Sequence, residues 1–415
     1  MADELQVYLR DHRVGWLKRT QFGITFAYDV DAEPEQISFC LPVQRNEFSN
    51  MATEAYFGGL LPENPLARQA IARQVNANAN DTFSLLRAIG RECAGAVSVV
   101  PVGEIPPSET FIQPEVFLDE SELERAILDL PRSPFFMDRG ARLSLAGFQG
   151  KACVVVDKGR IGLPEPSSFS THILKPDIRD EAGSYRNLVQ NEFLCLRLAQ
   201  LLKIPAAKAT MGRAKTQTYL LVERYDRSLQ GGFLRRLHQE DFCQALGFMS
   251  ASKYEIDGGP GYKRCFDLID DFTLPAKDEI TFLKYLIFNY LTGNADAHGK
   301  NYSVVHSTGT HKLAPLYDTV ATSAFADLSN KMAMSIGGEY SFLDVKRSNW
   351  EKLSEEIMLG FRAVKLELIR QAKKLPILAD EQRQTFKTGP FDSPSLDHTV
   401  SIIRSICEHT LSTIE

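Results

Sequence analysis

The feature that most constrains the fold of this chain is an apolar run that ends directly in a polar loop. Residues 280–291 read ITFLKYLIFNYL, and residues 294–301 read NADAHGKN. The apolar run predicts a buried helix, and a cluster of Asn, Asp and Gly is typical of a loop that caps a helix. The fold must therefore hold a group of polar side chains at the end of a buried helix: Asp296, His298, Lys300 and Asn301.

A predicted hairpin follows this loop and ends in a further carboxylate. Residues 302–306 read YSVVH, residues 307–310 form the turn STGT, and residues 312–318 read KLAPLYD. Because a hairpin returns its end close to its beginning, we expect Asp296, Asn301 and Asp318 to converge. Oxygen ligands of this kind suit Mg²⁺, which proteins hold by one or two carboxylates together with substrate phosphates.

The interval from Asp296 to Asn301 matches the D-x-x-x-x-N pattern of protein kinases. In that pattern the Asp accepts the proton of the substrate hydroxyl, the Asn binds a metal ion, and a second metal-binding Asp follows. The sequence thus predicts phosphoryl transfer, with Asp296 as the base and with Asn301 and Asp318 as metal ligands. Lys300 would neutralise charge on the transferred group.

His298 has three interpretations: a metal ligand, a donor to phosphate, or a structural donor to a neighbouring carbonyl. A single histidine without a second at ligand spacing argues against zinc. We favour a role in positioning the loop or the phosphate.

Two charged residues upstream are candidates for a nucleotide site. Lys175 ends the predicted strand THILK, where a lysine that reaches phosphates would lie, although a surface lysine at a strand end is equally compatible. Glu192 lies in the predicted helix of residues 186–202. It is either the helix glutamate that pairs with such a lysine in kinases or a solvated glutamate.

Two loops complete the candidate nucleotide site. Residues 144–151, SLAGFQGK, form a glycine-containing loop whose backbone N–H groups could cradle phosphates, although the loop does not fit the Walker pattern. Glu223, Arg224 and Tyr225 follow the predicted strand TYLLV and occupy either an adenine-binding hinge or an ordinary strand end. The order of all these features along the chain favours a nucleotide-dependent phosphotransferase.

Composition places the chain among globular proteins. It has 415 residues with 44% hydrophobic content, enough for two or three domains with their own cores, and a net charge of -6. A net negative charge gives no overall electrostatic attraction to nucleic acid or to an anionic membrane. The N-terminus lacks signal-peptide features, no stretch has the length of a spanning helix, and seven cysteines lack any C-x-x-C pair. We therefore expect a cytoplasmic protein with reduced, buried thiols and no membrane partner.

The pattern along the chain predicts four segments. Strands are expected at residues 5–10, 37–42 and 95–102, helices at 65–75 and 81–92, and further strands at 152–157, 171–176, 206–211 and 218–226. The chain from residue 237 onward is expected to be mainly helical apart from the hairpin after Asn301. The segments are an N-terminal α+β subdomain (1–105), a linker helix region (106–141), a nucleotide-binding part (142–236) and a helical lobe with the catalytic loop (237–415).

These residues resemble those of the HipA family, the serine/threonine kinase toxins of bacterial HipBA-type toxin–antitoxin pairs. Family motifs occur in order at LSLAGFQGK, HILKP, VERYD, YEIDGGPG, NADAHGKNYS and PLYD, and GLLPEN and IGRECAGAVS resemble the family's N-terminal subdomain. The resemblance spans nearly the whole chain. It implies an α+β fold with a kinase-like two-lobed core, an N-terminal α/β subdomain, a largely helical C-terminal lobe, and ATP and Mg²⁺ between the lobes.

The resemblance also implies roles for individual residues. Asp296 becomes the catalytic base, Asn301 and Asp318 the Mg²⁺ ligands, and Glu192 a possible partner of Lys175. The implied ATP-binding residues are Ala146, Gly147, Phe148, Gln149, Gly150, Lys151, Lys175, Glu223, Arg224, Tyr225, His298, Gly299, Lys300, Asn301, Tyr317 and Asp318. Ser144 becomes an autophosphorylation site, where a phosphate of roughly -1.5 to -2 charges beside ATP would act as an off-switch.

Partners and biological role follow from the same resemblance. It implies a HipB-like helix-turn-helix antitoxin, contact with operator DNA mainly through that antitoxin, and an aminoacyl-tRNA synthetase, of the glutamyl type, as the protein substrate. Phosphorylation would then arrest translation and promote dormancy, the persistent state. Two alternatives stay open, a catalytically weak co-repressor that binds the antitoxin and a small-molecule phosphotransferase. A metal-dependent hydrolase is more remote because paired histidines are lacking.

Overall fold

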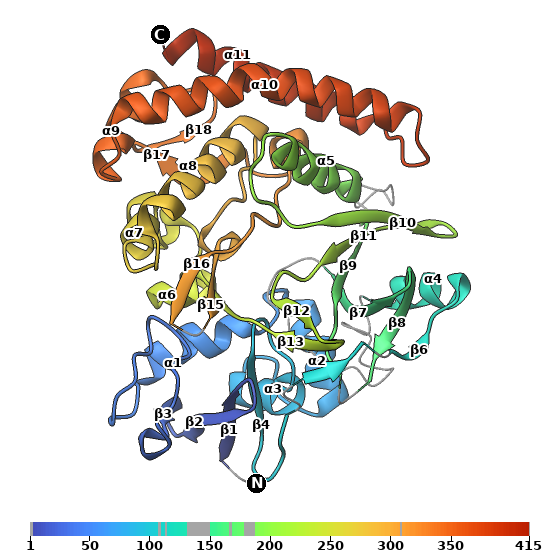
Figure 1. The fold of residues 1–415 in the computed structure, drawn as a ribbon, viewed down its shortest axis with the longest axis vertical. Coiled ribbons are helices and arrows are strands. Elements are labelled where there is room, and N and C mark those ends of the chain that lie inside the picture. Colours follow the sequence, from blue (N-terminus) through green and yellow to red (C-terminus); the bar gives the residue numbers. More distant parts are fainter. Residues whose placement is uncertain are drawn as a thin grey trace. The chain divides into compact units, whose positions relative to one another are not determined.

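The structure is a computed structural model that describes residues 3–106, 109–112, 114–130, 150–165, 168–177, 187–307 and 309–414. The chain divides into two compact units. Unit 1 comprises Met1–Pro176, Gly212–Ala251 and Val304–Gly309, and unit 2 comprises Asp177–Met211, Ser252–Ser303 and Thr310–Glu415. Both units contain helices and strands, as the α+β class requires (Figure 1). The division into four sequence segments stays a prediction.

The N-terminal part of unit 1 is a four-stranded antiparallel sheet in the order β3-β2-β1-β4. Strand β3 alternates between half-buried and buried residues, so Ile24, Phe26 and Tyr28 enter one apolar core with Phe57 of α1 and Leu86 of α3. Burial of each such side chain contributes about 1.5–3 kcal/mol. The elements are β1 (Glu4–Leu9), β2 (His12–Thr20), β3 (Gly23–Tyr28), β4 (Val97–Pro101), α1 (Asn50–Phe57), α2 (Pro65–Val75), α3 (Thr82–Ile89), η1 (Val30–Ala32) and η2 (Gly58–Leu60).

A six-stranded sheet in the order β10-β11-β9-β7-β8-β6 forms the second part of unit 1. Helix α4 packs against it through Leu123 and Ile127, which contact the core around Val154 and Leu174. The elements are β6 (Pro114–Phe117), α4 (Glu120–Asp129), β7 (Ala152–Asp157), β8 (Arg160–Pro164), β9 (His172–Pro176), β10 (Ala209–Ala214) and β11 (Gln217–Glu223). Strand β9 carries Lys175 at its fourth position and pairs with β11, which leads to the predicted hinge.

Short elements complete unit 1. Strands β12 (Arg227–Gln230), β13 (Phe233–Arg236) and β5 (Glu109–Phe111) form a small sheet, and β14 (His238–Asp241) pairs with β15 (Ser303–Ser307). Helix α6 (Phe242–Leu246) begins with a capping box, in which Asp241 accepts from the backbone N–H of Gln244 and the Gln244 side chain accepts in return. The 3₁₀ turn η4 (Ser250–Ser252) follows.

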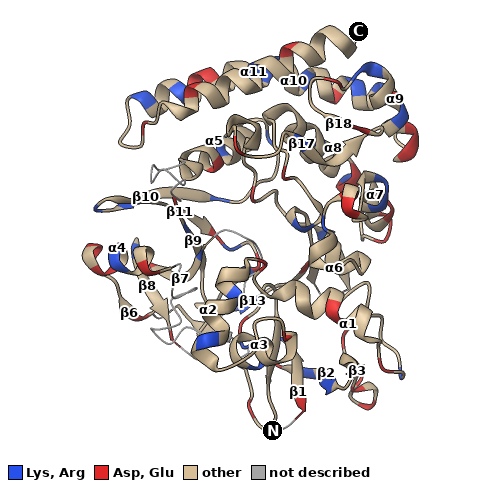
Figure 2. Ribbon diagram, turned by 180° about the vertical axis from the view of Figure 1, so that it is seen from behind, with Lys and Arg blue, Asp and Glu red and all other residues tan. Residues whose placement is uncertain are grey.

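Unit 2 is largely helical, as the sequence predicted for this part of the chain. Helices α10 and α11 lie side by side, and α10 also contacts α5 and α8 (Figure 1). Basic and acidic residues are interspersed along α10 (Figure 2). The elements are α5 (Leu188–Leu201), η5 (Glu255–Asp257), α7 (Tyr262–Ile269), α8 (Pro275–Thr292), η6 (Gly299–Asn301), β16 (Thr310–Leu313), η7 (Thr322–Ala324), β17 (Lys331–Ile336), β18 (Glu339–Ser341), α9 (Arg347–Glu356), α10 (Phe361–Lys387) and α11 (Ser395–Ile414).

Several sequence-based expectations about elements are wrong. Residues 37–42 form a turn rather than a strand, because the Glu240 carboxylate accepts hydrogen bonds from the Phe39 N–H and the Ser38 hydroxyl. Strands β2 and β3 were not predicted from the sequence, although their buried and less buried residues alternate as in a strand. Nor were β17 and β18, whose connection at Gly337 and Gly338 has positive φ angles of 55° and 90°, which favour glycine.

Two further findings concern the cysteines and the membrane. All seven cysteines are free thiols, six of them buried and Cys40 half-buried. In the described ranges, no helix is both long and apolar enough to cross a bilayer.

Candidate functional site

The candidate site of unit 2 starts where α8 stops. Gly293 follows the helix with a φ of 72°, and its N–H donates to the carbonyl of Tyr290, while the N–H of Asn294 donates to the carbonyl of Asn289. These two bonds form a Schellman motif, which satisfies the last carbonyls of the helix and turns the chain. A Cβ at Gly293 would approach Ile406 within 3.2 Å, so a glycine suits the position sterically as well.

The loop that follows is held by its own hydrogen bonds. We call residues 294–301 the Asp296 loop. The Asn294 side chain accepts from the N–H of Asp296 at 3.1 Å, and the Asp296 carbonyl accepts from the N–H of His298 at 2.9 Å. The Asn301 amide also donates to this carbonyl, at 2.7 Å. The loop is therefore closed upon itself by hydrogen bonds between its own residues.

Only one side chain of the loop projects into solvent. The side chain of Asp296 is 50% exposed, whereas Asn294, His298, Lys300 and Asn301 are all buried. A carboxylate that stands alone on a rigid, otherwise buried loop is accessible to a substrate and is held in place. This is the arrangement that a candidate general base requires.

Asn289 is a buried amide of α8 that the sequence analysis did not single out. Its Nδ2 donates to the hydroxyl of Tyr302 at 3.0 Å, and its Oδ1 accepts from the Asn294 amide and from the Thr319 hydroxyl, each at 3.0 Å. One side chain thus joins both ends of the Asp296 loop to the residue after Asp318. A lone Asn within the apolar run was the signal available in the sequence.

The segment that carries Asp318 lies against the Asp296 loop, as the predicted hairpin requires. The Tyr317 hydroxyl donates to the Lys300 carbonyl at 2.8 Å, and the Thr322 hydroxyl accepts from the N–H of Ala295 at 2.7 Å. Asp318 has a φ of 52°, a left-handed conformation that is uncommon for a residue with a side chain. Such strain is held by the surrounding contacts and is found most often at functional sites.

The environment of the Asp296 carboxylate includes an unexpected tyrosine. The Tyr254 hydroxyl donates to Asp296 Oδ1 at 2.6 Å, and His298 Nε2 lies 3.8 Å from the same oxygen. The rings of Tyr254 and His298 meet edge to face, with centroids 5.3 Å apart. Tyr254 belongs to the motif YEIDGGPG, for which the residues alone gave no role. The contact between His298 and Asp296 fits the positioning role favoured for this histidine.

The donor set of unit 2 fits a hard divalent cation of the Mg²⁺ type. Because the Asp296 carbonyl can only accept, the NH₂ of Asn301 must face it, and the Asn301 Oδ1 is left as an acceptor. Among the described residues, no cluster of three His, Cys, Asp or Glu side chains is arranged to hold a metal ion. A Mg²⁺ that binds through substrate phosphates needs only one or two protein carboxylates, and Asn301 with Asp318 meets that requirement.

Lys175 and Glu192, the upstream candidates, are both buried. The exposed fraction is 7% for Lys175, on β9 of unit 1, and 4% for Glu192, on α5 of unit 2. The two alternatives of a surface lysine and a solvated glutamate are therefore wrong. Charged side chains are seldom buried without a partner of opposite charge.

The glycine-containing loop lies mostly outside the described residues. Ser144 and Ala146, Gly147, Phe148 and Gln149 belong to that part of the chain, and their predicted roles stay predictions. Gly150 is exposed and Lys151 is half-buried directly before β7.

The predicted hinge, residues 223–225 of unit 1, is anchored by Arg224. The backbone N–H of Arg224 donates to the Thr171 carbonyl at 3.0 Å, so this group is not available to an adenine ring. Glu223 is exposed and Tyr225 is half-buried, and the Tyr225 hydroxyl donates to the Gln239 side chain. The adenine-binding prediction therefore rests on Glu223 and Tyr225.

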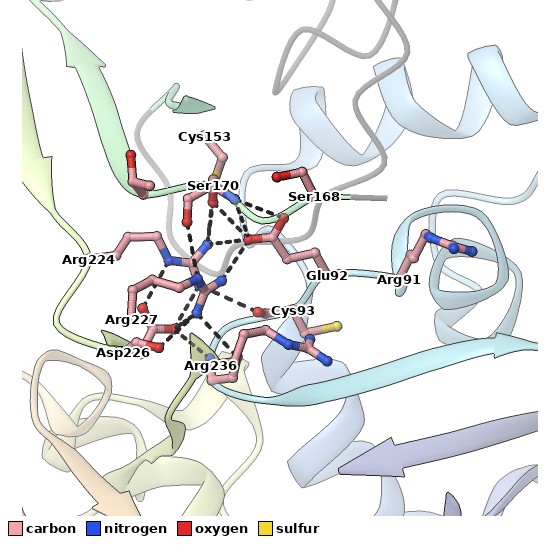
Figure 3. A network of polar contacts seen from close by, with 12 residues as sticks. Arg91, Glu92, Cys93, Cys153, Ser168, Ser170, Arg224, Asp226, Arg227 and Arg236 are labelled. Atoms are coloured by element: carbon pink, nitrogen blue, oxygen red, sulfur yellow. Dashed lines mark hydrogen bonds and ion pairs between the residues drawn. The ribbon is translucent and has the colours of Figure 1, made fainter. Parts of the chain in front are cut away.

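The Arg224 side chain enters a buried network of charges, which we call the Glu92 network (Figure 3). Glu92 contacts Arg224 at 3.1 Å and Arg227 at 2.6 Å, and Asp226 contacts the same two arginines at 2.7 and 2.9 Å. Ser170, two residues before β9, donates through its hydroxyl to Glu92 at 2.8 Å. The network joins Glu92, which lies between α3 and β4, to the residues just before β9 and just after β11.

The buried charges shift the pKa values of Asp226 and of the neighbouring Arg236. Burial opposes ionisation of Asp226, but Arg224 and Arg227 outweigh it and hold the pKa of this carboxyl well below its usual range. Burial and the nearby charge of Arg227 lower the pKa of Arg236 to about 10. Arg236 lies over the ring of Phe169, with its guanidinium carbon 4.7 Å from the centroid, and donates to Ser98 and to the Val97 carbonyl.

Comparison with protein families identifies both parts of the chain. A family model described as the HipA-like C-terminal domain matches residues 143–378, and a model described as the HipA N-terminal domain matches residues 5–100. A relative named putative kinase Y4mE, from Sinorhizobium fredii, is 36% identical over 371 residues, which cover 87% of each chain. The serine/threonine-protein kinase toxin HipA of Shewanella oneidensis is 31% identical over 390 residues, which cover 90% of this chain and 87% of the relative.

A solved structure of Shewanella oneidensis HipA, in a complex with HipB and operator DNA, also matches. The TM-score is 0.84 at 27% identity, and the match covers 99% of this chain and 98% of that chain. The fold and these relatives define an enzyme of the kinase class with a kinase-like core. The chain belongs to the HipA family of serine/threonine-protein kinase toxins.

Proposed function

We propose that this chain is an ATP- and Mg²⁺-dependent kinase that phosphorylates serine or threonine hydroxyls of a protein. The observation that supports this proposal most directly is the Asp296 loop, a buried and self-bonded loop that leaves one carboxylate half exposed. When bound, ATP and Mg²⁺ would supply the phosphoryl group and neutralise its charge. Asn301 and Asp318 are the residues proposed to hold the metal ion, and Lys175 is the residue proposed for the phosphates.

The chain's own residues would orient the acceptor hydroxyl, the metal ion and ATP, and would accept the proton of that hydroxyl. Asp296 would orient the acceptor hydroxyl and take its proton, since a carboxylate within hydrogen-bond reach serves as a general base. Asn301 would link base and metal, because its amide donates to the Asp296 carbonyl while its oxygen stays available. Glu223 and Tyr225 would bind adenine, and Glu192 would pair with Lys175.

We further propose that the kinase is the toxin of a type II toxin–antitoxin pair. Shewanella oneidensis HipA, which this chain resembles along nearly its whole length, was solved in a complex with HipB and operator DNA. A HipB-like antitoxin would be the partner of this chain and would bring it to operator DNA. The substrate would be an aminoacyl-tRNA synthetase of the glutamyl type, with loss of translation, dormancy and persistence as the result. Seven free cysteines fit a reducing compartment such as the cytoplasm.

Self-inactivation at Ser144 is the regulatory part of the proposal. A phosphoserine in the glycine-containing loop would add roughly two negative charges next to the nucleotide phosphates and repel them. The proposal rests on the family resemblance and on the position of Ser144 within SLAGFQGK.

A second candidate function is that of a co-repressor that strengthens DNA binding by the antitoxin without phosphoryl transfer. The complex of the Shewanella relative with HipB and DNA favours it. The half-exposed Asp296 on its closed loop favours the kinase, since a binding module does not require such a residue.

The experiment that tests the proposal measures phosphate on the purified chain and on an added glutamyl-tRNA synthetase. The chain is first checked by intact mass for earlier phosphorylation and is then incubated with Mg²⁺ and ATP. We expect phosphate on Ser144 and on the synthetase with the wild type, and on neither with Asp318→Asn. Ser144→Ala serves as the matched control, because it removes the acceptor and should leave transfer to the synthetase intact. An unphosphorylated wild-type chain that gains no phosphate and modifies no protein would favour the co-repressor.

A further inference from the structure

The motif YEIDGGPG forms a tight turn that aims Tyr254 at the Asp296 loop. The Tyr254 carbonyl accepts from the N–H of Gly259 at 2.9 Å, which closes the turn around η5. A Cβ at Gly259 would lie 2.3 Å from the Ser252 carbonyl oxygen, and a Cβ at Gly261 would lie 2.5 Å from the Glu255 carboxylate. Glycines at these positions therefore permit a compact turn, and the turn fixes the backbone of Tyr254.

The turn and the Asp296 loop are attached to the same strand. The Glu255 carboxylate accepts from the N–H of Ser335, and the carbonyl of Ala295 accepts from the N–H of Ala333 at 2.9 Å. Ala333 and Ser335 are two residues apart on β17, so their N–H groups point to the same side of the strand. Tyr254 and Asp296 each lie next to one of these attachment points, and β17 therefore sets the distance between them.

The two oxygens of the Asp296 carboxylate have different environments. Oδ1 accepts from the Tyr254 hydroxyl at 2.6 Å, a short distance typical of a charge-assisted bond. Within the part of the chain that the structure describes, Oδ2 accepts no hydrogen bond, and the side chain is half exposed. A carboxylate held through one oxygen cannot rotate freely about its last torsion, so the other oxygen keeps a fixed direction.

We propose that Tyr254 is a positioning residue that orients the Asp296 carboxylate so that Oδ2 receives the proton of the acceptor hydroxyl. This inference rests on the proposed kinase function and adds a residue that the D-x-x-x-x-N pattern does not contain. Tyr254 acts through Asp296 and takes no part in binding ATP. Its loss therefore lowers the rate of the transfer step and leaves nucleotide affinity unchanged.

The test compares Tyr254→Phe with Tyr285→Phe in the full-length chain. Tyr254→Phe removes only the hydroxyl and keeps the ring beside His298. Tyr285→Phe is the matched control in the same unit, because its hydroxyl donates at 3.1 Å to the Ala314 carbonyl rather than to the Asp296 carboxylate. Radiolabelled ATP is the probe. Transfer of label to the chain and to glutamyl-tRNA synthetase gives kcat and the KM for ATP, and thermal unfolding gives the Tm.

We expect kcat of Tyr254→Phe to fall roughly 10-fold, the loss of one hydrogen bond to a charged group, with the KM for ATP changed less than about 2-fold. Tyr285→Phe should keep kcat and lose some Tm. An unchanged kcat in Tyr254→Phe would overturn the inference, as would a fall that comes with a parallel rise in KM and a loss of Tm. A wild-type chain that transfers no label would overturn the proposed function itself, and the inference with it.

Discussion

Two groups of charged residues, one in each unit, differ in how far their carboxylates are exposed. In unit 1, the carboxylates of Glu92 and Asp226 are enclosed, and each contacts both Arg224 and Arg227. In unit 2, the Asp296 carboxylate stands half exposed with one oxygen bonded to Tyr254. A carboxylate enclosed by its partners is closed to a substrate, and removing it leaves buried charges unpaired, whereas a carboxylate with an open oxygen on a self-bonded loop is available to a substrate. The comparison predicts that substitutions in the first region change stability and those in the second change rate.

The largest effect should come from Asp296→Asn. The amide keeps the size of the side chain and cannot act as a base, so we expect the rate of phosphate transfer to fall by about 10²–10⁴-fold. Stability should change by less than about 0.5 kcal/mol, because the side chain is half exposed. Kinetics with labelled ATP and a thermal melt of the same preparation measure both quantities. A large loss of Tm together with the loss of rate would contradict the separation of the two regions.

The second largest effect should come from Glu92→Gln, which leaves two arginines with one carboxylate fewer. Breaking a buried pair on one side costs about 3–5 kcal/mol, because the remaining charge is left buried without its partner. Denaturant unfolding measures this loss of free energy.

Glu104→Gln is the matched control for the Glu92 network. Glu104 pairs with Arg91 at 3.1 Å, and its side chain is 43% exposed, so the same substitution should cost less than about 1 kcal/mol. Figure 3 shows the Arg91 side chain directed away from the Glu92 network. Equal losses for the two variants would mean that burial of the network does not contribute to stability.

Asn289→Leu should lower both the stability of the protein and the rate of phosphate transfer. Leucine has a similar size but leaves the partners of the amide, Asn294, Tyr302 and Thr319, without their bonds to it. We expect a loss of about 2–4 kcal/mol in the free energy of unfolding and a slower transfer rate, since the Asp296 loop and the Asp318 segment share this amide. Retained activity in a destabilised variant would show that the loop keeps its geometry without Asn289.

The smallest effect should be a pH dependence of unit 1 through His238. Burial, reinforced by the stacked ring of His306 at 5.0 Å, holds the pKa of His238 well below its usual 6.5. Below pH 6.5 the unfolded chain therefore binds a proton that the folded chain does not, and stability falls as the pH falls. The Tm measured from pH 7 to pH 5 should decline less in His238→Gln than in the wild type. Identical slopes would rule out His238 as the source.

Local patterns predicted the part of the candidate site that lies within one stretch of sequence. The apolar run, the Asp296 loop and the hairpin to Asp318 are close in sequence, and the structure joins them through Tyr317 and Thr322. Strand β7 occupies Ala152–Asp157, which is the predicted range. These elements are local in sequence, so the periodicity of hydrophobic residues and the turn-forming residue types were sufficient to predict them.

Contacts between distant residues could not be predicted in this way. The segment of Ser38 and Phe39 has the composition of a strand. Its Ser38 hydroxyl and Phe39 N–H instead donate to the carboxylate of Glu240, about 200 residues later. Glu92 and Arg224 are 132 residues apart, and neither has a local sequence pattern that predicts a buried ion pair. Tyr254 stood inside a motif that was visible in the sequence, but its bond to Asp296 depends on the separate attachment of both segments to β17.

The discontinuous make-up of unit 1 has a consequence for the order in which the protein is made. Its last piece, Val304–Gly309, supplies most of β15, which pairs with β14 and places His306 against His238. A ribosome must therefore synthesise most of the chain, including the Asp296 loop, before unit 1 can close. Synthesis proceeds at about 5–20 residues per second, so for many seconds the nascent chain carries the Asp296 loop before the rest of unit 2 has been made. The last segment of unit 2, Thr310–Glu415, is synthesised only after unit 1 has received its last strand.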